Sequence, residues 1–421
     1  MNYSIEARLY DELVSLEGLR QEEPVGVVVA DDDALQRAYT SAVLRKLGYA
    51  PVEAANGTEA LDLIRGGAAQ ILVCDLDMPG IDGHELAREV RRDPGDTYIH
   101  ILMLTAQNQG HERERALEAG VDDFMAKPLD TASLTARMRS ADRLLQREKQ
   151  LATRNRVLAE AKEQIEADLR AAADAQRRLL PAAHARVGGC AFHSAFMPSH
   201  ILSGDMFGYF PLGDGLTGFY AVDVAGHGVH ASLMSVALGH LLTADYFRGH
   251  VFDAEGNPDP AELVRALNAR FYTEDGTEYF TMFAGIVDAT SDTLHFCQAG
   301  YPSPCIMTHS GACRRVGDGG FPVALISSAS FESGVISLRE GEFLALSSDG
   351  ATEAEDPAGT AFGDEGLAKV FKASAAEPDA IPGKLVDALT RWRATRPLDD
   401  DLTVLVCERI AASWHCCRTA F

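Results

Sequence analysis

A stretch of fifty residues without a helix breaker divides this chain. Residues 131–180 contain neither glycine nor proline, and Pro181 follows them directly. Within the stretch an apolar position recurs every seven residues, at Leu144, Leu151, Leu158, Ile165, Ala172 and Leu179. This spacing is typical of a coiled coil, so we predict a coiled-coil linker helix over 131–182. The full length of 421 residues leaves room for a separate domain on each side.

The companion heptad position of this segment is less regular. It carries Asn155, Lys162, Leu169 and Gln176. A buried Asn at such a position commonly fixes a parallel, in-register dimer at some cost in stability, and we therefore expect a homodimer through the coiled coil. The pattern leaves open a monomeric, solvated helix that packs along one domain.

The segment before the linker, residues 25–130, alternates short β-rich runs with helical patterns. The runs are VGVVVA (25–30), QILVCD (70–75), HILMLT (100–105) and DDFMA (122–126). This alternation predicts a doubly wound α/β domain with a parallel sheet. The active site of such a domain lies at the carboxyl ends of its strands, so we expect the chemically active side chains there.

Acidic, hydroxyl and amino side chains end or follow these runs. They are Asp31 and Asp32 after the first run, Asp75 and Thr105 at the ends of the next two, and Lys127 after the last. Carboxylates gathered at one sheet edge would bind a hard cation such as Mg²⁺. One carboxylate can then be phosphorylated in line, with the cation and the ammonium group neutralising the phosphoryl oxygens.

The motifs VVVADDD, ILVCDLDMPGIDG, MLTA and KPL resemble those of the CheY-like receiver domain of response regulators, over residues 25–130. The resemblance implies that Asp75 is the phosphoacceptor and that Asp31, Asp32 and Asp75 hold Mg²⁺. It also implies a cognate histidine kinase or phosphotransfer protein as partner. Asp33 stands just before the next helical pattern, and we expect it only to cap that helix.

Three further residues match the switch of the receiver family. The resemblance implies that Thr105 and Lys127 contact the phosphate and that Phe124 occupies the aromatic position that rotates on activation. A hydroxyl such as that of Thr105 can hydrogen-bond the added phosphoryl group and move with it. A buried core aromatic is an alternative interpretation of Phe124.

Residues 183–410 have a different sequence pattern, with short apolar runs typical of strands, many glycines and two helical blocks at 229–247 and 259–273. They predict an α+β domain, a β-sandwich flanked by helices, and a tail follows over 411–421. Acidic residues border the apolar strand runs at Asp205, Asp223, Asp349 and Asp400. Two divalent metals held by carboxylates from separate strands provide a strong device for hydrolysing phosphate monoesters.

These segments resemble the PPM family of metal-dependent serine/threonine phosphatases, in particular its SpoIIE-type and RsbU-type branch. The resemblance implies a site with two Mn²⁺ or Mg²⁺ ions. Asp223 would bridge both metals, and the backbone carbonyl of Val224 would add a ligand. Asp349 and Asp400 would complete the shell of one metal, while Asp205 would support the other.

At some positions of this second site the pattern leaves alternatives open. His227, in an AGHG turn, is the candidate general acid because the pKa of an imidazole lies near working pH, although a structural role in the turn is an alternative. Asp401 competes with Asp400 as a ligand. The chain departs from the family at Gly208, where a second Asp is usual, and at Tyr301, where His is frequent. We therefore expect activity with altered metal affinity.

The composition argues against several other classes of protein. The formal net charge of −24 argues against nucleic acid and an anionic membrane surface as partners. The sequence contains no run of roughly 18 apolar residues, so we expect no transmembrane helix. Residues 1–24 are mixed and acidic, which argues against a signal peptide. The helical spacing of Ile5, Leu9, Leu13 and Leu16 predicts a short helical extension there. The eight cysteines are scattered without a CxxC pair, as expected of a cytoplasmic protein with reduced thiols.

Both resemblances together predict a response regulator whose output is dephosphorylation of phosphoserine or phosphothreonine on a partner protein. The family implies a STAS-type anti-sigma-factor antagonist as substrate, in a partner-switching pathway gated by the receiver. A different class of function remains open, in which the receiver controls a non-catalytic adaptor that sequesters a sigma-factor regulator.

Overall fold

The computed structural model describes residues 25–92, 98–106, 110–226, 228–274, 276 and 278–411. The chain divides into two compact units, Met1–Lys162 and Glu163–Phe421, and each is described by itself. The helical extension predicted for residues 1–24 lies outside the described residues, as does the predicted tail from residue 412 on.

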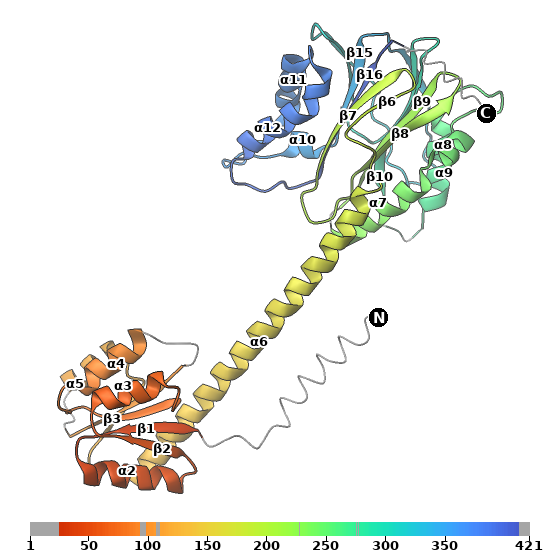
Figure 1. The fold of residues 1–421 in the computed structure, drawn as a ribbon. Coiled ribbons are helices and arrows are strands. Elements are labelled where there is room, and N and C mark those ends of the chain that lie inside the picture. Colours follow the sequence, from red (N-terminus) through yellow and green to blue (C-terminus); the bar gives the residue numbers. More distant parts are fainter. Residues whose placement is uncertain are drawn as a thin grey trace, which may run out of the picture. The chain divides into compact units, whose positions relative to one another are not determined.

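The first unit is built around a parallel sheet of five strands in the order β2-β1-β3-β4-β5 (Figure 1). The strands are β1 (Gly26–Ala30), β2 (Ala50–Ala54), β3 (Ile71–Asp75), β4 (His100–Thr105) and β5 (Asp123–Ala126). The helices are α2 (Ala34–Lys46), α3 (Gly57–Arg65), α4 (Gly83–Arg92) and α5 (Gly110–Glu118). This is the predicted α/β receiver architecture, and that prediction is confirmed.

Both faces of this sheet are buried, as the continuous apolar runs require. Val28, Leu72 and Ile101 face α3, α4 and α5 in one hydrophobic cluster. Val29 and Val73 belong to a second cluster on the opposite face, with residues of α2 and of the linker helix. The successive strand residues alternate between the two clusters because side chains along a strand point to opposite faces.

The first helix of this unit begins as the sequence predicts. The carboxylate of Asp33 accepts hydrogen bonds from the backbone N–H groups of Leu35 and Gln36, at 2.8 and 3.2 Å. These bonds satisfy two of the amide donors left open at the start of α2. The capping role predicted for Asp33 is therefore confirmed.

The linker is a single helix, α6 (Thr131–Arg177). Its first turns pack against the receiver sheet through Leu134, Met138 and Ala141. Farther along, the apolar heptad positions Leu144, Leu151, Leu158 and Ile165 are exposed to solvent, with Leu158 at 67%. None of the described helices is both long and apolar enough to cross a membrane.

One heptad residue of α6 differs from its predicted role in a coiled-coil seam. Gln176 is buried within the second unit, and its Nε2 donates to the carbonyl of Ser203 at 2.6 Å and to Ser235 Oγ at 2.7 Å. The backbone N–H of Ser203 donates back to Gln176 Oε1 at 3.2 Å. A side chain committed in this way is not available to a second helix, so Gln176 is an anchor and not a seam residue.

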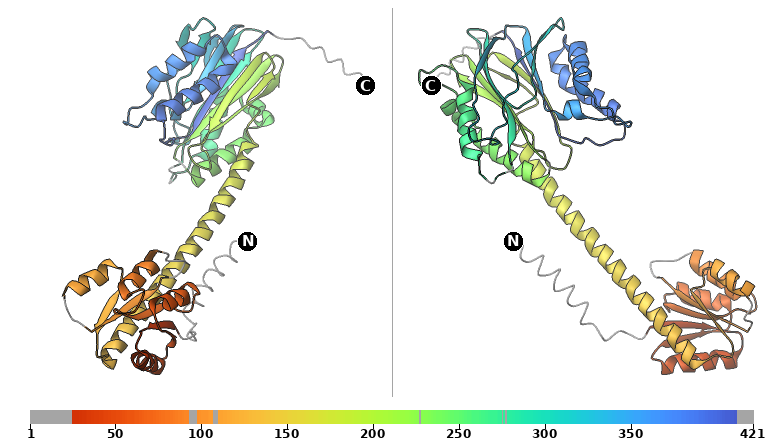
Figure 2. Two further views of the ribbon diagram at one scale, coloured as in Figure 1. Left: turned by 60° about the vertical axis from the view of Figure 1, so that its left-hand side comes forward. Right: turned by 180° about the vertical axis from the view of Figure 1, so that it is seen from behind.

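The second unit packs two antiparallel sheets face to face (Figure 2). One sheet has the order β14-β11-β10-β9-β8, with β8 (Met206–Gly213), β9 (Leu216–Val224), β10 (Phe280–Asp288), β11 (Thr293–Ala299) and β14 (Gly334–Ser337). The other has the order β13-β12-β15-β16-β7-β6, with β6 (His184–Val187), β7 (Cys190–Met197), β12 (Cys305–Thr308), β13 (Cys313–Arg315), β15 (Glu342–Ser347) and β16 (Leu402–Arg409). Phe219 and Phe283 from the first sheet meet Phe192, Leu344 and Leu405 from the second in the core between them.

Helices cover the outer face of each sheet, which confirms the predicted sandwich flanked by helices. The first sheet is covered by α7 (Val229–Leu241), α8 (Ala244–His250) and α9 (Pro260–Phe271). The second is covered by α10 (Gly350–Glu353), α11 (Gly363–Ser374) and α12 (Ile381–Arg393). The block predicted as one helix over 229–247 is two helices, because the chain turns at Thr243, whose hydroxyl caps α8.

Candidate functional site

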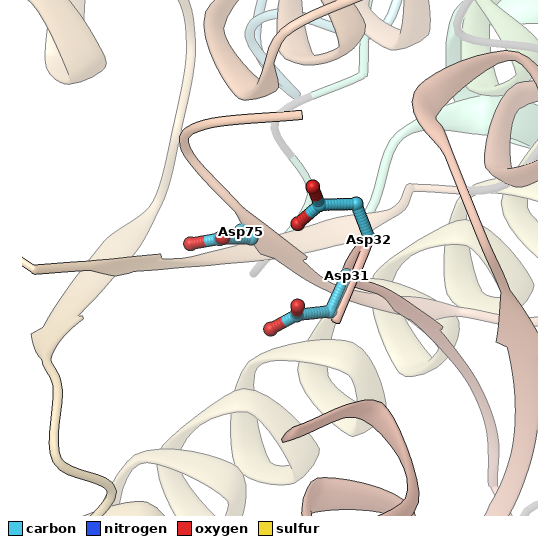
Figure 3. A group of neighbouring side chains, drawn as sticks. All are labelled: Asp31, Asp32 and Asp75. Carbon is cyan, nitrogen blue, oxygen red and sulfur yellow. The ribbon is translucent and has the colours of Figure 1, made fainter. Parts of the chain in front are cut away.

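The first unit gathers three carboxylates at the carboxyl ends of two neighbouring strands (Figure 3). Asp31 and Asp32 follow β1 directly, and Asp75 is the last residue of β3. Each offers an oxygen, and these oxygens all lie within 4.8 Å of one another. Asp31 and Asp75 are buried and Asp32 is exposed, so the group has one side open to solvent. Oxygen ligands spaced in this way fit a hard cation such as Mg²⁺.

Lys127 lies beside this acidic group. Its Nζ lies 3.0 Å from Asp31 Oδ2 and 2.9 Å from Asp75 Oδ1. Partial burial lowers the pKa of Lys127, but the hydrogen bonds to Asp75 and Asp31 outweigh it, so the pKa is raised. Burial also raises the pKa of Asp75, against the opposing effect of Lys127. The ammonium group therefore stays charged beside the carboxylate predicted to accept a phosphoryl group.

The two remaining receiver residues lie on the neighbouring strands. Thr105 is the buried last residue of β4, and its carbonyl accepts a hydrogen bond from the backbone N–H of Lys127 at 2.8 Å. Phe124, on β5, is partly buried and packs against the cluster between the sheet and α3, α4 and α5. The parallel sheet therefore brings Thr105 to the edge where Asp31, Asp75 and Lys127 meet.

The second unit places four carboxylates at neighbouring strand ends of its two sheets. Asp223 is near the end of β9, beside Asp205 just before β8. Asp349 follows β15, and Asp400 precedes the adjacent strand β16. Val224, the last residue of β9, is buried beside Gly204, since its carbonyl oxygen would lie 2.9 Å from a Cβ added there.

The negative charges of these carboxylates act on one another's pKa values. Burial and the negative charge of Asp223 hold the pKa of Asp205 well above its usual range. Burial, followed by the charges of Asp349 and Asp400, raises the pKa of Asp223 to about 8. Carboxylates that raise one another's pKa values in a buried place are a common arrangement at metal and catalytic sites.

Several oxygens of this cluster are buried without a hydrogen-bond partner. They are both carboxylate oxygens of Asp205 and Oδ1 of Asp349. A buried polar atom without a partner costs about 1–3 kcal/mol. Divalent cations would supply the missing partners and relieve the mutual repulsion, so the residues present fit such ions. Within the described ranges, however, only Asp31, Asp32 and Asp75 bring three ligand atoms within 4.8 Å of one another.

The two adjacent residues Asp400 and Asp401 have different surroundings. The carboxylate of Asp401 accepts from Ser199 N at 2.7 Å, Ser199 Oγ at 2.9 Å and Gly204 N at 2.7 Å. Asp401 is buried, whereas Asp400 is partly exposed and accepts from the backbone N–H of Asp401 at 2.7 Å. Asp401 therefore holds the loop before β8 in place.

Gly208 and Tyr301, the two positions that depart from the family pattern, are both closely packed. A Cβ added to Gly208 would lie 2.6 Å from Cε1 of Tyr220, so the ring of Tyr220 occupies the space that a side chain there would need. Tyr301 is buried, and its hydroxyl has no hydrogen-bond partner. His227, the predicted general acid, lies outside the described residues.

One acidic residue near this cluster is absent from the sequence-based predictions. Glu353 is on α10, and partial burial together with the charges of Asp349 and Asp400 raises its pKa. The segment ATEAED resembles an ordinary acidic surface turn, so only its position next to Asp349 in the sequence could have drawn attention to Glu353.

Two families of known proteins match this chain. The first unit is an α/β unit with an acidic group at its sheet edge, and the second is a two-sheet unit with buried carboxylates. The model of the response regulator receiver domain matches residues 27–139, and that of Stage II sporulation protein E (SpoIIE) matches residues 213–410. The chain thus combines a receiver domain with a SpoIIE-type phosphatase domain.

Several known proteins are similar to parts of this chain. Response regulator MprA of Mycobacterium sp. (strain KMS) is 40% identical over 117 residues, 28% of this chain and 50% of that protein. The chain thus spans about half the length of the curated relatives it matches. The SiaA-PP2C domain of Pseudomonas aeruginosa is 21% identical with a TM-score of 0.50, over 60% of this chain and 99% of that one, which shows a shared fold. The RsbU and RsbW domains of Rv1364c from Mycobacterium tuberculosis are 24% identical with a TM-score of 0.44, over 54% and 62% of the two chains.

Proposed function

We propose that this protein is a response regulator whose output is metal-dependent dephosphorylation of phosphoserine or phosphothreonine on a regulatory protein, gated by phosphorylation of Asp75. The observation that carries this proposal is the group of buried, mutually repelling carboxylates in the SpoIIE-type domain, around Asp205 and Asp223. A domain that served only to bind a partner would have no evident use for such a group.

The receiver site supports phosphorylation of Asp75. A phosphoryl group added to this carboxylate would lie close to the ammonium group of Lys127, now 2.9 Å from Asp75 Oδ1. Asp31 and Asp32 would hold Mg²⁺ beside it, and Thr105 at the next strand end would hydrogen-bond the phosphoryl oxygens. The donor would be a cognate histidine kinase or phosphotransfer protein.

The phosphatase site supports hydrolysis of a phosphate monoester. Divalent cations held there would activate the attacking water and neutralise charge on the phosphoryl group. Asp223 is beside Asp205 at the strand ends, and the charges of Asp349 and Asp400 act on it, so it is suited to bridge two ions. Asp205 and Asp349 offer unpartnered oxygens, and Val224 would offer its carbonyl. We prefer Asp400 to Asp401 as the remaining ligand because the oxygens of Asp401 are occupied by three donors.

The substrate that we propose is a phosphorylated STAS-type anti-sigma-factor antagonist, as the SpoIIE-type domain implies. His227 would protonate the leaving serine or threonine oxygen. The exposed heptad residues of α6 support a homodimer, since a second copy of the helix would cover them.

The direct test is turnover of a phosphorylated STAS protein by the purified chain with Mn²⁺, measured with and without acetyl phosphate. We expect phosphate release that EDTA abolishes. Asp223→Asn and Asp349→Asn should lose nearly all turnover, whereas Asp387→Asn, an exposed residue of α12, should keep it. Tight binding of the substrate without turnover would instead favour the receiver-controlled adaptor.

A further inference from the structure

Tyr301 is a buried tyrosine with an unusual hydroxyl. It follows β11 after Gly300, which has a φ of +75°. The side chain is 1% exposed and packs in the core between the sheets with Phe207, Phe283 and Leu346. The hydroxyl, however, has no hydrogen-bond partner. Most buried polar groups have a partner, so an unpartnered one calls for an explanation.

Strand pairing places Tyr301 near the carboxylate cluster. Gly300, just before it, bridges to Met282 of β10, and the preceding residue Thr281 pairs with Asp223 of β9. The charges of Asp205, Asp223 and Asp349 all raise the pKa of Tyr301, after the larger effect of burial. Both oxygens of Asp205 and Oδ1 of Asp349 are also buried without a partner. A donor and three acceptors are therefore buried near one another without a hydrogen bond between them.

The chemistry of the Tyr301 hydroxyl and of the carboxylates limits which ligand can bond to both. A phenol donates one hydrogen bond, whereas ionised carboxylates only accept. A cation alone would satisfy the carboxylates, but it has no lone pair to accept from the phenol. A water molecule that a cation binds satisfies both, because its oxygen accepts from the phenol while the cation meets the carboxylates.

We propose that Tyr301 is a positioning residue of the phosphatase site, whose hydroxyl donates a hydrogen bond to a water molecule bound by the cation that Asp205 and Asp349 hold. This inference rests on the proposed function of the same site. Burial and the surrounding negative charge keep the phenol protonated and therefore a donor. Substitution at Tyr301 should change how tightly the site binds its metal.

The test compares two tyrosines that differ in their surroundings. Tyr301→Phe removes only the hydroxyl. Tyr220→Phe is the matched control, because Tyr220 is also buried in this unit but only burial raises its pKa, with no effect from the carboxylates. Both are made in an Asp32→Asn, Asp75→Asn background, which removes the receiver's own cation site. Thermal melting of the full chain is followed in EDTA and across a Mn²⁺ titration.

We expect Tyr301→Phe to melt in EDTA at or above the temperature of its parent, because an unpartnered buried hydroxyl is removed. Its midpoint for stabilisation by Mn²⁺ should rise about fivefold to tenfold, the loss of one hydrogen bond. Tyr220→Phe should leave the Mn²⁺ midpoint unchanged. An unchanged midpoint in Tyr301→Phe, with Mn²⁺ still stabilising the parent, would overturn this role alone. A parent that Mn²⁺ does not stabilise would overturn both this role and the proposed function.

Discussion

Neighbouring carboxylates in this protein have separate tasks, as Asp400 and Asp401 illustrate. Asp401 is buried and bonded to Ser199 and Gly204, so Asp401→Asn should cost about 3 kcal/mol of stability. This loss would lower the melting temperature by about 6–12 °C. Asp400→Asn should leave the melting temperature in EDTA nearly unchanged and weaken Mn²⁺ binding at least about tenfold. Calorimetry in EDTA and with Mn²⁺ measures both effects, and the reverse pattern would assign the metal to Asp401.

The raised pKa of Asp223 predicts how the metal-free protein responds to pH. The carboxyl titrates near 3.8 when exposed and near 8 in the folded chain, so between these values the folded state holds the extra proton. Raising the pH through this window removes that proton at the expense of the folded state, and stability should fall. Melting temperatures in EDTA from about pH 5 to about pH 8, a range inside this window, check this. Asp223→Asn should flatten the decline, and an equal decline in that variant would locate its cause elsewhere.

Protons and metal compete for the same carboxylate. Because Asp223 is protonated below about pH 8 in the metal-free protein, Mn²⁺ must displace a proton there and should bind more weakly as the pH falls. This competition gives a second, independent check on the same residue.

At the scale of elements, the exposed stripe of α6 predicts self-association. Leu151 and Leu158 are 52% and 67% exposed, and they continue the heptad pattern of Leu144 and Ile165. Leu151→Lys with Leu158→Lys would place two charges in the seam of a coiled-coil dimer. We expect the wild-type chain to sediment as a dimer and this variant as a monomer. Equal sedimentation of the two would mean that α6 does not pair.

Gln176, near the carboxyl end of α6, leads to a different prediction. Gln176→Leu would leave the N–H and carbonyl of Ser203 without their partner, two residues before Asp205. We expect the second unit to lose about 2–4 kcal/mol of stability and to bind Mn²⁺ more weakly. Asn155→Leu is the control, since Asn155 is exposed on the same helix and should change the stability of this unit by less than about 0.5 kcal/mol. Similar effects of the two substitutions would contradict the anchoring role of Gln176.

At the scale of the whole molecule, the two units should communicate through an element that both bias. We expect acetyl phosphate to label the wild type and to change its Mn²⁺-dependent turnover about fivefold or more, the size typical of allosteric coupling. Asp75→Asn should show neither the label nor the change. Labelling of Asp75→Asn at the wild-type level would place the acceptor elsewhere, and a full turnover response without labelling would separate the two events.

The sequence by itself determined the division of the chain and much of the chemistry. A fifty-residue stretch without glycine or proline strongly favours a helix, and α6 spans Thr131–Arg177 of it. The receiver pocket was predictable because parallel strands bring their carboxyl ends to one edge, so Asp31, Asp75, Thr105 and Lys127 converge wherever the loops run. Local capping, as at Asp33, depends on neighbours in sequence and was predictable for the same reason.

Only the tertiary structure decided roles that depend on distant partners. Asp400 and Asp401 are the same kind of residue. Only Asp401 accepts hydrogen bonds from the backbone of Ser199 and Gly204, about two hundred residues away in sequence. Gln176 fits a coiled-coil position by spacing, yet Ser203 and Ser235 bind it. The hydroxyl of Tyr301 likewise became notable only because folding buried it beside carboxylates from other strands. Periodicity records which face of an element is apolar, whereas a hydrogen-bond partner is chosen by how separate elements pack, and no local pattern encodes that choice.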